Sequence, residues 1–287
     1  MGNPFIPLPR CENIIIVGDS ATEYLGALRM YGRGLIGGEV PSMELLHPME
    51  KHLECVACFL NDPTQVLMPA VRRMQADYVV LEENDTPDFN PAVAREALEK
   101  EGVVVKILDV RGTPEEVLRR AGRLFGEEKQ AERVIRERTE RLAALQEAAR
   151  TIRRGQKAVI LLAIRSPIRH ESYVFRVSER GALSALLTET FGVENLNVRP
   201  DAEERIPGIQ DLDDLSDLFA KNPDLIVSTG DAAACGMEIA RFLKAHPEFA
   251  ACPAVSQGRI YGAPYYCRPL DWKRHEILEA WADVLAE

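Results

Sequence analysis

Residues 13–27, NIIIVGDSATEYLGA, decide the fold of this chain. Asn13–Val17 is a short apolar run with β-branched residues side by side, which is typical of a buried parallel strand. The run ends at Gly18, and apolar residues at helical spacing follow it. Ser20 is predicted to cap this helix, with Glu23 completing a capping box. The stretch therefore predicts a strand–turn–helix unit.

The same alternation continues along the chain. Strands are predicted at 34–38, 77–81, 103–108, 158–164, 225–228 and 259–262. Helices are predicted at 70–75, 90–100, 113–125, 181–191, 212–220, 232–245 and 272–286. Strands that alternate with helices predict an α/β fold in which crossover helices cover parallel sheets.

One long helix interrupts the alternation. Residues 127–154 contain neither glycine nor proline, and apolar residues recur there at spacings of three, four and seven. This pattern predicts a single amphipathic helix that joins two α/β lobes. The expected domains are an N-terminal lobe at 1–126, the backbone helix at 127–154 and a C-terminal lobe at 155–287. Because ligands of open parallel sheets gather at the carboxyl ends of the strands, a ligand cleft is expected between the lobes.

Composition excludes several classes of function. The chain has 287 residues, of which 46% are hydrophobic and 28% charged, as in ordinary globular proteins. A formal net charge of −10 argues against nucleic acid as a partner, because phosphate binding needs a concentrated positive field. No stretch approaches the ~18–20 apolar residues of a membrane span. The N-terminus has no pattern of a signal peptide, so the sequence as it stands predicts a cytoplasmic protein, or an extracytoplasmic one if a leader has been removed.

The order of motifs resembles a known family. IIIVGDSATEYLGALRMYGRGLIG, QADYVVLEE, EALEKEGVVVKIL, FRVSERGALSALLTETFGVENL, NPDLIVSTG and AVSQGRIYGAPYYCRPLDW occur in that order. Together with the long helix they are similar to class III solute-binding proteins of ABC importers, the iron–siderophore, haem and cobalamin binders. The resemblance covers nearly the whole chain, and NPDLIV and QGRIY are its most specific parts.

The resemblance implies two Rossmann-like lobes that bind a metal chelate or tetrapyrrole without catalysis and without an intrinsic cofactor. The bound iron chelate, haem or corrinoid would be the ligand, and an ABC permease would be the partner. In this family an acidic residue on each lobe docks arginines of the permease. The matching positions here are Pro69 and Ser216, and Asp213, Asp214 and Asp217 would have to substitute in the second lobe.

Several residues of the N-terminal part are candidates for ligand binding. Ser20 and Glu39 follow predicted strands, and His47 lies in the loop where resembling haem binders place an axial ligand. Imidazole suits iron and other transition metals. Met43 and Met49 flank His47, and core packing is the expected role of these methionines.

The richest stretch follows the strand at 158–164 and reads RSPIRHESYVFR. Its candidates for a ligand-binding rim are Arg165, Arg169, His170, Tyr173 and Arg176. Guanidinium groups bind carboxylates or phosphates bidentately, which fits an anionic chelate, although a solvated loop is an equally good interpretation.

Near the C-terminus, aromatic and cationic residues gather. Tyr265 and Arg268 are candidates for the wall of a flat, apolar ligand, whereas Trp272 is expected to pack in the core.

Two further clusters have competing interpretations. Glu82, Glu83 and Asp85 follow a predicted strand and would bind a cation or, as is more common, form a solvated rim. Cys55 and Cys58 form a CVAC motif, which would be a soft-metal or redox pair or simply two free thiols.

Two alternative functions remain open. One is a cytoplasmic carrier or sensor of the same ligands that is not coupled to a permease. The other is a tetrapyrrole metal chelatase, whose catalytic pair would be His170 and Glu39.

Overall fold

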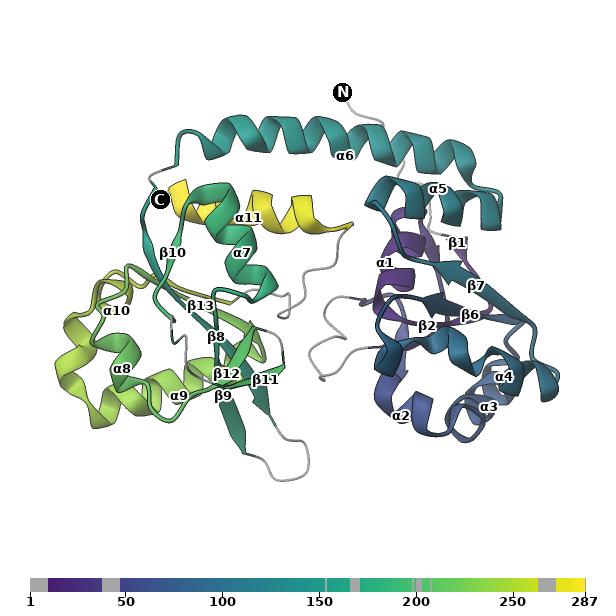
Figure 1. The fold of residues 1–287 in the computed structure, drawn as a ribbon, viewed down its shortest axis with the longest axis horizontal. Helices are drawn as coiled ribbons and strands as arrows, with labels where there is room; N and C mark the ends of the chain where they lie inside the picture. The colour runs from purple at the N-terminus through teal and green to yellow at the C-terminus, as the bar shows by residue number, and fades with distance from the viewer. Residues whose placement is uncertain are drawn as a thin grey trace. The chain divides into compact units, whose positions relative to one another are not determined.

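The computed structural model describes residues 10–37, 47–152, 154–165, 171–197, 199, 203–206, 208–262 and 272–286 (Figure 1). The chain divides into two compact units. The first is Met1–Glu140 with Leu270–Trp272, and the second is Arg141–Pro269 with Lys273–Glu287. Within these described ranges, every helix is either too short or too polar to cross a membrane.

The first unit is built on a parallel sheet of five strands in the order β5-β4-β2-β6-β7. Their bounds are β2 (Ile14–Val17), β4 (Gly34–Ile36), β5 (Lys51–Glu54), β6 (Tyr78–Glu83) and β7 (Val105–Asp109). Every neighbouring pair is parallel, as the alternation of strands and helices predicts. A separate parallel pair joins β1 (Arg10–Cys11) to β3 (Met30–Tyr31).

The central strand β2 is buried on both faces, which explains why its sequence is continuously apolar. Ile14 and Ile16 pack with α1 (Asp19–Ala27) and α5 (Pro114–Phe125). Ile15 and Val17 belong to the opposite core. Side chains of α2 (Val56–Asn61), α3 (Pro63–Met74), η3 (Pro91–Ala94) and α4 (Arg95–Lys100) also belong to that core. A further short turn, η2 (Pro87–Phe89), precedes η3 in the chain. Trp272 packs in the first core, as expected, with its ring 6.0 Å from that of Tyr24.

The second unit contains a mixed sheet of seven strands in the order β11-β12-β9-β8-β13-β14, with β10 beside β8. The bounds are β8 (Lys157–Arg165), β9 (Ser172–Val177), β10 (Glu194–Asn195), β11 (Glu204–Ile206), β12 (Ile209–Asp211), β13 (Leu225–Gly230) and β14 (Ile260–Gly262). β10, β13 and β14 run parallel in this sheet with β8, whereas β9 is antiparallel to β8 and β12 is antiparallel to β9. β9 lies in the stretch that the sequence indicated as either a ligand-binding rim or a solvated loop, and no strand was predicted there.

Helices cover both faces of this second sheet (Figure 1). One face packs against α8 (Ser216–Phe219), α9 (Ala232–Ala245), η4 (Pro247–Ala251) and α10 (Pro253–Ser256). Phe219 is the centre of this core, with its ring 5.0 Å from Phe242 and 6.0 Å from Phe249. α7 (Ala182–Phe191) and α11 (Arg274–Ala286) lie on the other face.

The long helix α6 spans Glu128–Ala149, 22 residues without interruption. It is shorter than the predicted range 127–154, because the chain tightens after it. The N–H groups of Arg150, Thr151 and Ile152 donate to carbonyls three residues back, which is the pattern of a helix end. The boundary between the two units falls inside α6, after Glu140.

Removing the ring of Phe219 tests the core of the second unit. Phe219→Ala is expected to lower the free energy of unfolding by about 3–5 kcal/mol, because the cavity would be enclosed by other buried side chains. Urea titration followed by circular dichroism measures the change. Met237→Ala, on the exposed side of α9, is the control and is expected to leave the transition unchanged. An equal effect of the two substitutions would contradict this assignment of the core.

Candidate functional site

The topology of the first sheet places a site at the carboxyl ends of β2, β4 and β6. From β2 the chain passes to β4 on one side of the sheet and later to β6 on the other side. Strand order therefore reverses next to β2. In open α/β sheets, ligands bind outside the carboxyl ends of the strands at such a point.

Gly18 forms the sharp turn from β2 into α1. Its φ of 122° is a conformation that side chains rarely adopt, and a Cβ there would overlap the side chain of Glu82. Gly18 also precedes the helix as its N-cap residue and supplies no side-chain cap. The predicted capping box is therefore wrong: Ser20 is the second residue of α1, and Glu23 is buried inside the unit.

Glu82, at the end of β6, caps α1 from a distance. Its Oε2 atom accepts a hydrogen bond of 3.0 Å from the N–H of Ala21, and the N–H of Ser20 also donates to this carboxylate. Its Oε1 atom accepts a hydrogen bond of 2.8 Å from Asn84. A carboxylate at a helix N-terminus interacts favourably with the helix dipole.

The exposed fraction of Glu82 is only 6%, so this residue does not belong to a solvated rim. Burial raises the pKa of Glu82, and the hydrogen bonds from Asn84, Ala21 and Ser20 offset only part of that effect. Glu83 and Asp85 do face solvent more, and they lie 3.2 Å and 4.0 Å from the guanidinium of Arg111.

His47 lies at the same edge of the sheet and is also buried, with an exposed fraction of 5%. Its Nε2 atom is 3.9 Å from Oδ1 of Asp19, the first residue of α1. Gly37, directly after β4, makes room for Asp19, since a Cβ there would lie 2.5 Å from Oδ1. The structure thus brings the predicted His47 together with Asp19, which sequence reasoning did not single out. Asp19 lies directly after a buried strand and a glycine, and this position was the signal in the sequence that could have identified it.

The other predicted residues of this part have different outcomes. Glu39 and Met43 lie outside the described residues. Met49 is half exposed rather than packed in the core.

In the second unit, Arg165 and Tyr173 lie at one edge of the sheet. Arg165 ends β8 and is exposed, and Tyr173 pairs in register with Ile164. The Tyr173 hydroxyl donates a hydrogen bond of 2.6 Å to Glu171. Arg165 and Glu171 line a hollow of about 390 Å³ beside α9. The predicted residues Arg169, His170, Tyr265 and Arg268 lie outside the described residues.

Arg176 does not lie at this rim, contrary to expectation. It is 1% exposed and lies within β9, opposite Leu161 of β8 and Gln210 of β12. Side chains alternate along a strand, so Arg176 is on the opposite face from Tyr173. Burial lowers the pKa of Arg176, and the positive charge of Arg199 adds to the effect, while the carboxylates of Asp213 and Asp217 oppose it.

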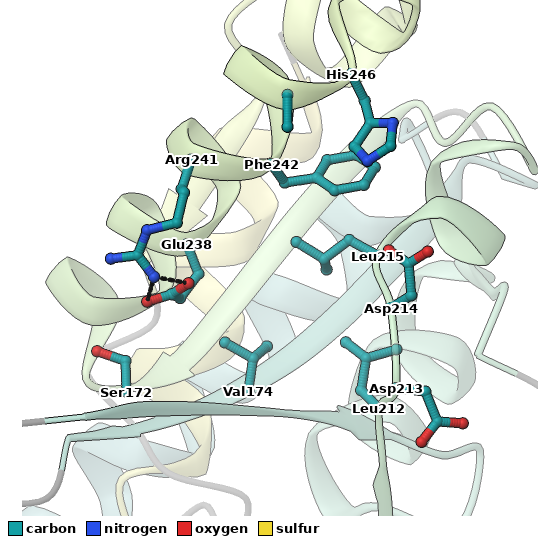
Figure 2. A pocket seen from close by; sticks show the side chains of 11 residues that line it. Ser172, Val174, Leu212, Asp213, Asp214, Leu215, Glu238, Arg241, Phe242 and His246 are labelled. Atoms are coloured by element: carbon teal, nitrogen blue, oxygen red, sulfur yellow. Dashed lines mark hydrogen bonds and ion pairs between the residues drawn. The ribbon is translucent and has the colours of Figure 1, made fainter.

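A second hollow in this unit, of about 440 Å³, has a mixed lining of apolar and charged side chains (Figure 2). Asp213 and Asp214 face it from the segment before α8, and Glu238, Arg241 and His246 come from α9 and the residue after it. Arg241 donates to both oxygens of Glu238, at 2.8 Å and 2.6 Å. The hydrogen bond from the N–H of Ser216 lowers the pKa of Asp214. Both aspartates are exposed to solvent.

At the other positions that the resemblance connects with a permease, two residues have no carboxylate and the third is paired with an arginine. Pro69 is an interior residue of α3, and Ser216 is the first residue of α8. Asp217 is paired with Arg199 at 2.9 Å.

The profile of a family described as Periplasmic binding protein matches residues 61–266. The chain belongs to this family. The match extends over well more than half of the sequence and confirms the predicted resemblance. No curated protein matches the chain.

Solved structures of periplasmic binding proteins share the fold of this family member. The periplasmic heme-binding protein RhuT from Roseiflexus sp. RS-1 is 16% identical, with a TM-score of 0.63 over 96% of this chain and 98% of that one. The iron-uptake system-binding protein FeuA from Bacillus subtilis is 18% identical, with a TM-score of 0.61 over 95% and 94%. A periplasmic heme binding protein from Pseudomonas aeruginosa is 18% identical, with a TM-score of 0.60 over 97% and 92%. These likenesses confirm the predicted α/β fold.

The raised pKa of Glu82 predicts a pH-dependent stability. Between the ordinary value of 4.5 and the higher folded value, the folded chain binds more protons at Glu82 than the unfolded chain does. The contribution of Glu82 to the free energy of unfolding therefore falls as the pH rises through this window and is constant above it. Glu82→Gln removes this titration, so the stability of the wild type relative to the variant should decline across the window.

Urea unfolding at a series of pH values from about 4 to about 8 measures this difference. Glu101→Gln, at an exposed position of the same unit, is the control and should keep the pH dependence of the wild type. If the wild type and Glu82→Gln show the same slope against pH, the buried carboxyl group does not titrate as described.

Proposed function

We propose that this chain binds a metal chelate or tetrapyrrole of the iron–siderophore, haem or cobalamin class, as the substrate-binding component of an ABC importer. The observation that carries the proposal is the placement of His47 beside Asp19 at the strand-order reversal of the first sheet. The family consists of binding proteins, and the proposal assigns no catalytic step to the chain.

The pair of His47 and Asp19 has the chemistry of a metal ligand with its supporting carboxylate. Metal-binding histidines usually direct their second ring nitrogen at a carboxylate, a carbonyl or a water, which orients the ring and raises its basicity. Nε2 of His47 lies 3.9 Å from Oδ1 of Asp19, so a shift of about 1 Å would form such a hydrogen bond and leave Nδ1 to coordinate the metal of the chelate. Such a ring can bind the iron of haem or another transition-metal centre.

The names of the structural neighbours support the same class of ligand. Two of them are named as heme-binding proteins and one as an iron-uptake protein. All three share the fold of this chain over more than nine-tenths of its length, and an iron centre is common to the ligands named. The proposal extends that ligand class to this chain.

In the second unit, Arg165 and Tyr173 have the chemistry to bind an anionic group. Both side chains are exposed at the edge where β8 ends. A guanidinium group would bind a carboxylate of the ligand, such as a tetrapyrrole propionate, through two parallel hydrogen bonds.

Asp213 and Asp214 would bind the protein partner, an ABC permease. These carboxylates are exposed, and Asp214 is ionised readily because a backbone N–H stabilises its charge. Arginines of a permease would bind such a pair through charge-assisted hydrogen bonds.

The role of His47 can be tested with haem. His47→Ala should weaken haem binding by about tenfold or more and change the visible absorption of the bound haem, because an axial nitrogen ligand is lost. Absorption titration of the purified, full-length protein measures both effects. His246→Ala is the matched control, since this partly exposed histidine lies in the other unit and pairs with Glu248 at 3.3 Å.

The outcomes separate the residue from the function. Equal binding and equal spectra of His47→Ala and the wild type would remove His47 from the site. Titrations with a ferric siderophore and with a corrinoid then test the ligand class. If haem, ferric chelate and corrinoid all fail to bind, the proposed function itself is wrong. Native mass spectrometry of protein purified from its own host identifies which member of the class is bound.

A further inference from the structure

We propose that Glu54, Cys55 and Cys58 form a surface site for a thiophilic divalent cation such as Zn²⁺. The site belongs to the first unit and uses none of the residues of the proposed ligand site. The CVAC motif supplies its two sulfur ligands, and the residue just before the motif supplies an oxygen ligand.

The three ligand atoms already lie close enough for one ion. The Sγ atoms of Cys55 and Cys58 and a carboxylate oxygen of Glu54 all lie within 4.8 Å of one another. Two sulfurs bound to one tetrahedral zinc at about 2.3 Å are about 3.8 Å apart. Rotations of the side chains alone would therefore close the site around the ion.

The three ligand residues lie where β5 ends and α2 begins, and the backbone brings their side chains to one place. Cys55 is the N-cap of α2 and Cys58 lies one helical turn later, so the two thiols share a face of the helix. Val56 and Phe59 are buried and fix the opposite face in the core. The cysteines therefore point outward because their neighbours in the helix point inward.

A register shift brings Glu54 to the same place. Leu35 of β4 pairs with His52, but Ile36 pairs with Glu54, so Leu53 is an extra residue in β5. Such bulges redirect the side chains that follow them. The N–H of Gly37 donates to the carbonyl of Glu54 at 3.1 Å and holds this end of the strand.

Hydrogen bonds prearrange the donors. The N–H of Cys58 donates to Sγ of Cys55 at 3.4 Å, which fixes the position of that sulfur. The N–H of Cys55 donates to Oε1 of Glu54 at 3.0 Å and keeps the carboxylate beside the thiols. Both contacts reduce the conformational freedom that would be lost when an ion binds.

The donor set selects the kind of ion. Two thiolates favour Zn²⁺ and Cd²⁺ over Mg²⁺ and Ca²⁺, which prefer oxygen ligands. Three protein ligands leave a fourth position to water, and Cys58 is exposed. The bound ion would therefore exchange with solvent and with chelators.

Metal titration of the reduced full-length protein tests the proposal. Zn²⁺ added in competition with a chromophoric chelator should bind at one equivalent per chain. Cd²⁺ alone should produce a thiolate-to-metal charge-transfer absorption in the ultraviolet. Cys55→Ser and Cys58→Ser should each weaken Zn²⁺ binding by about tenfold or more and reduce that absorption, and Glu54→Gln should weaken binding to a smaller degree.

The choice of variants separates metal loss from misfolding. Serine is a good N-cap, so Cys55→Ser should keep α2 intact, and circular dichroism checks this. Cys11→Ser is the matched control because Cys11 is another exposed free cysteine of the same unit, and it should bind Zn²⁺ as the wild type does.

Two results would overturn the proposal. One is Zn²⁺ binding that is unchanged in Cys58→Ser or lost equally in Cys11→Ser. The other is a reduced protein that binds no Zn²⁺ and in which Cys55 and Cys58 only form a disulfide on oxidation. The two sites share no residues, so the zinc proposal can fail while haem or chelate binding is still observed. The two proposals are therefore tested independently.

Discussion

The burial of β2 on both faces is the constraint on which the first unit depends. Its four residues are all inaccessible to solvent and face two different helical layers. The strand therefore cannot slide by one residue, because the shift would place Asn13 or Gly18 in the apolar core instead of Val17 or Ile14. Gly18, Asp19 and Ser20 follow it directly, so the core holds the residues of the ligand edge in place.

Glu82 shows how the same core produces unusual chemistry. Its backbone ends β6 beside β2, and the adjacent turn at Gly18 leaves space for a carboxylate against the first N–H groups of α1. The helix terminus and Asn84 satisfy its oxygens, while burial disfavours its charge. This carboxyl group takes up a proton at a higher pH than an exposed one, and it lies at the edge of the sheet where ligands of this fold class bind.

Much of the fold could be predicted from the sequence, because apolar runs and helical periodicity are local signals. Residues 232–245 were predicted as a helix, and they are α9 in the structure. β9 was not predicted because its charged and polar residues interrupt the apolar pattern of a strand. The strand is only partly buried, so its sequence does not need a continuous apolar face. The burial of Glu82 was missed because its partner, the N-terminus of α1, lies about sixty residues away in the sequence. The position of Arg176 inside β9 was hidden for the same kind of reason: its cover comes from strands and loops distant along the chain.

The bulge at Leu53 has a consequence for solubility as well as for the cysteines. β5 is the outermost strand on its side of the first sheet, so one row of its backbone groups has no neighbouring strand within the described residues. Such edges invite strands of other molecules and promote aggregation. The irregular register and the exposed charge of Lys51 make this edge a poor template for another strand. The distortion that brings a carboxylate to two thiols thus also helps to keep separate copies of the protein apart.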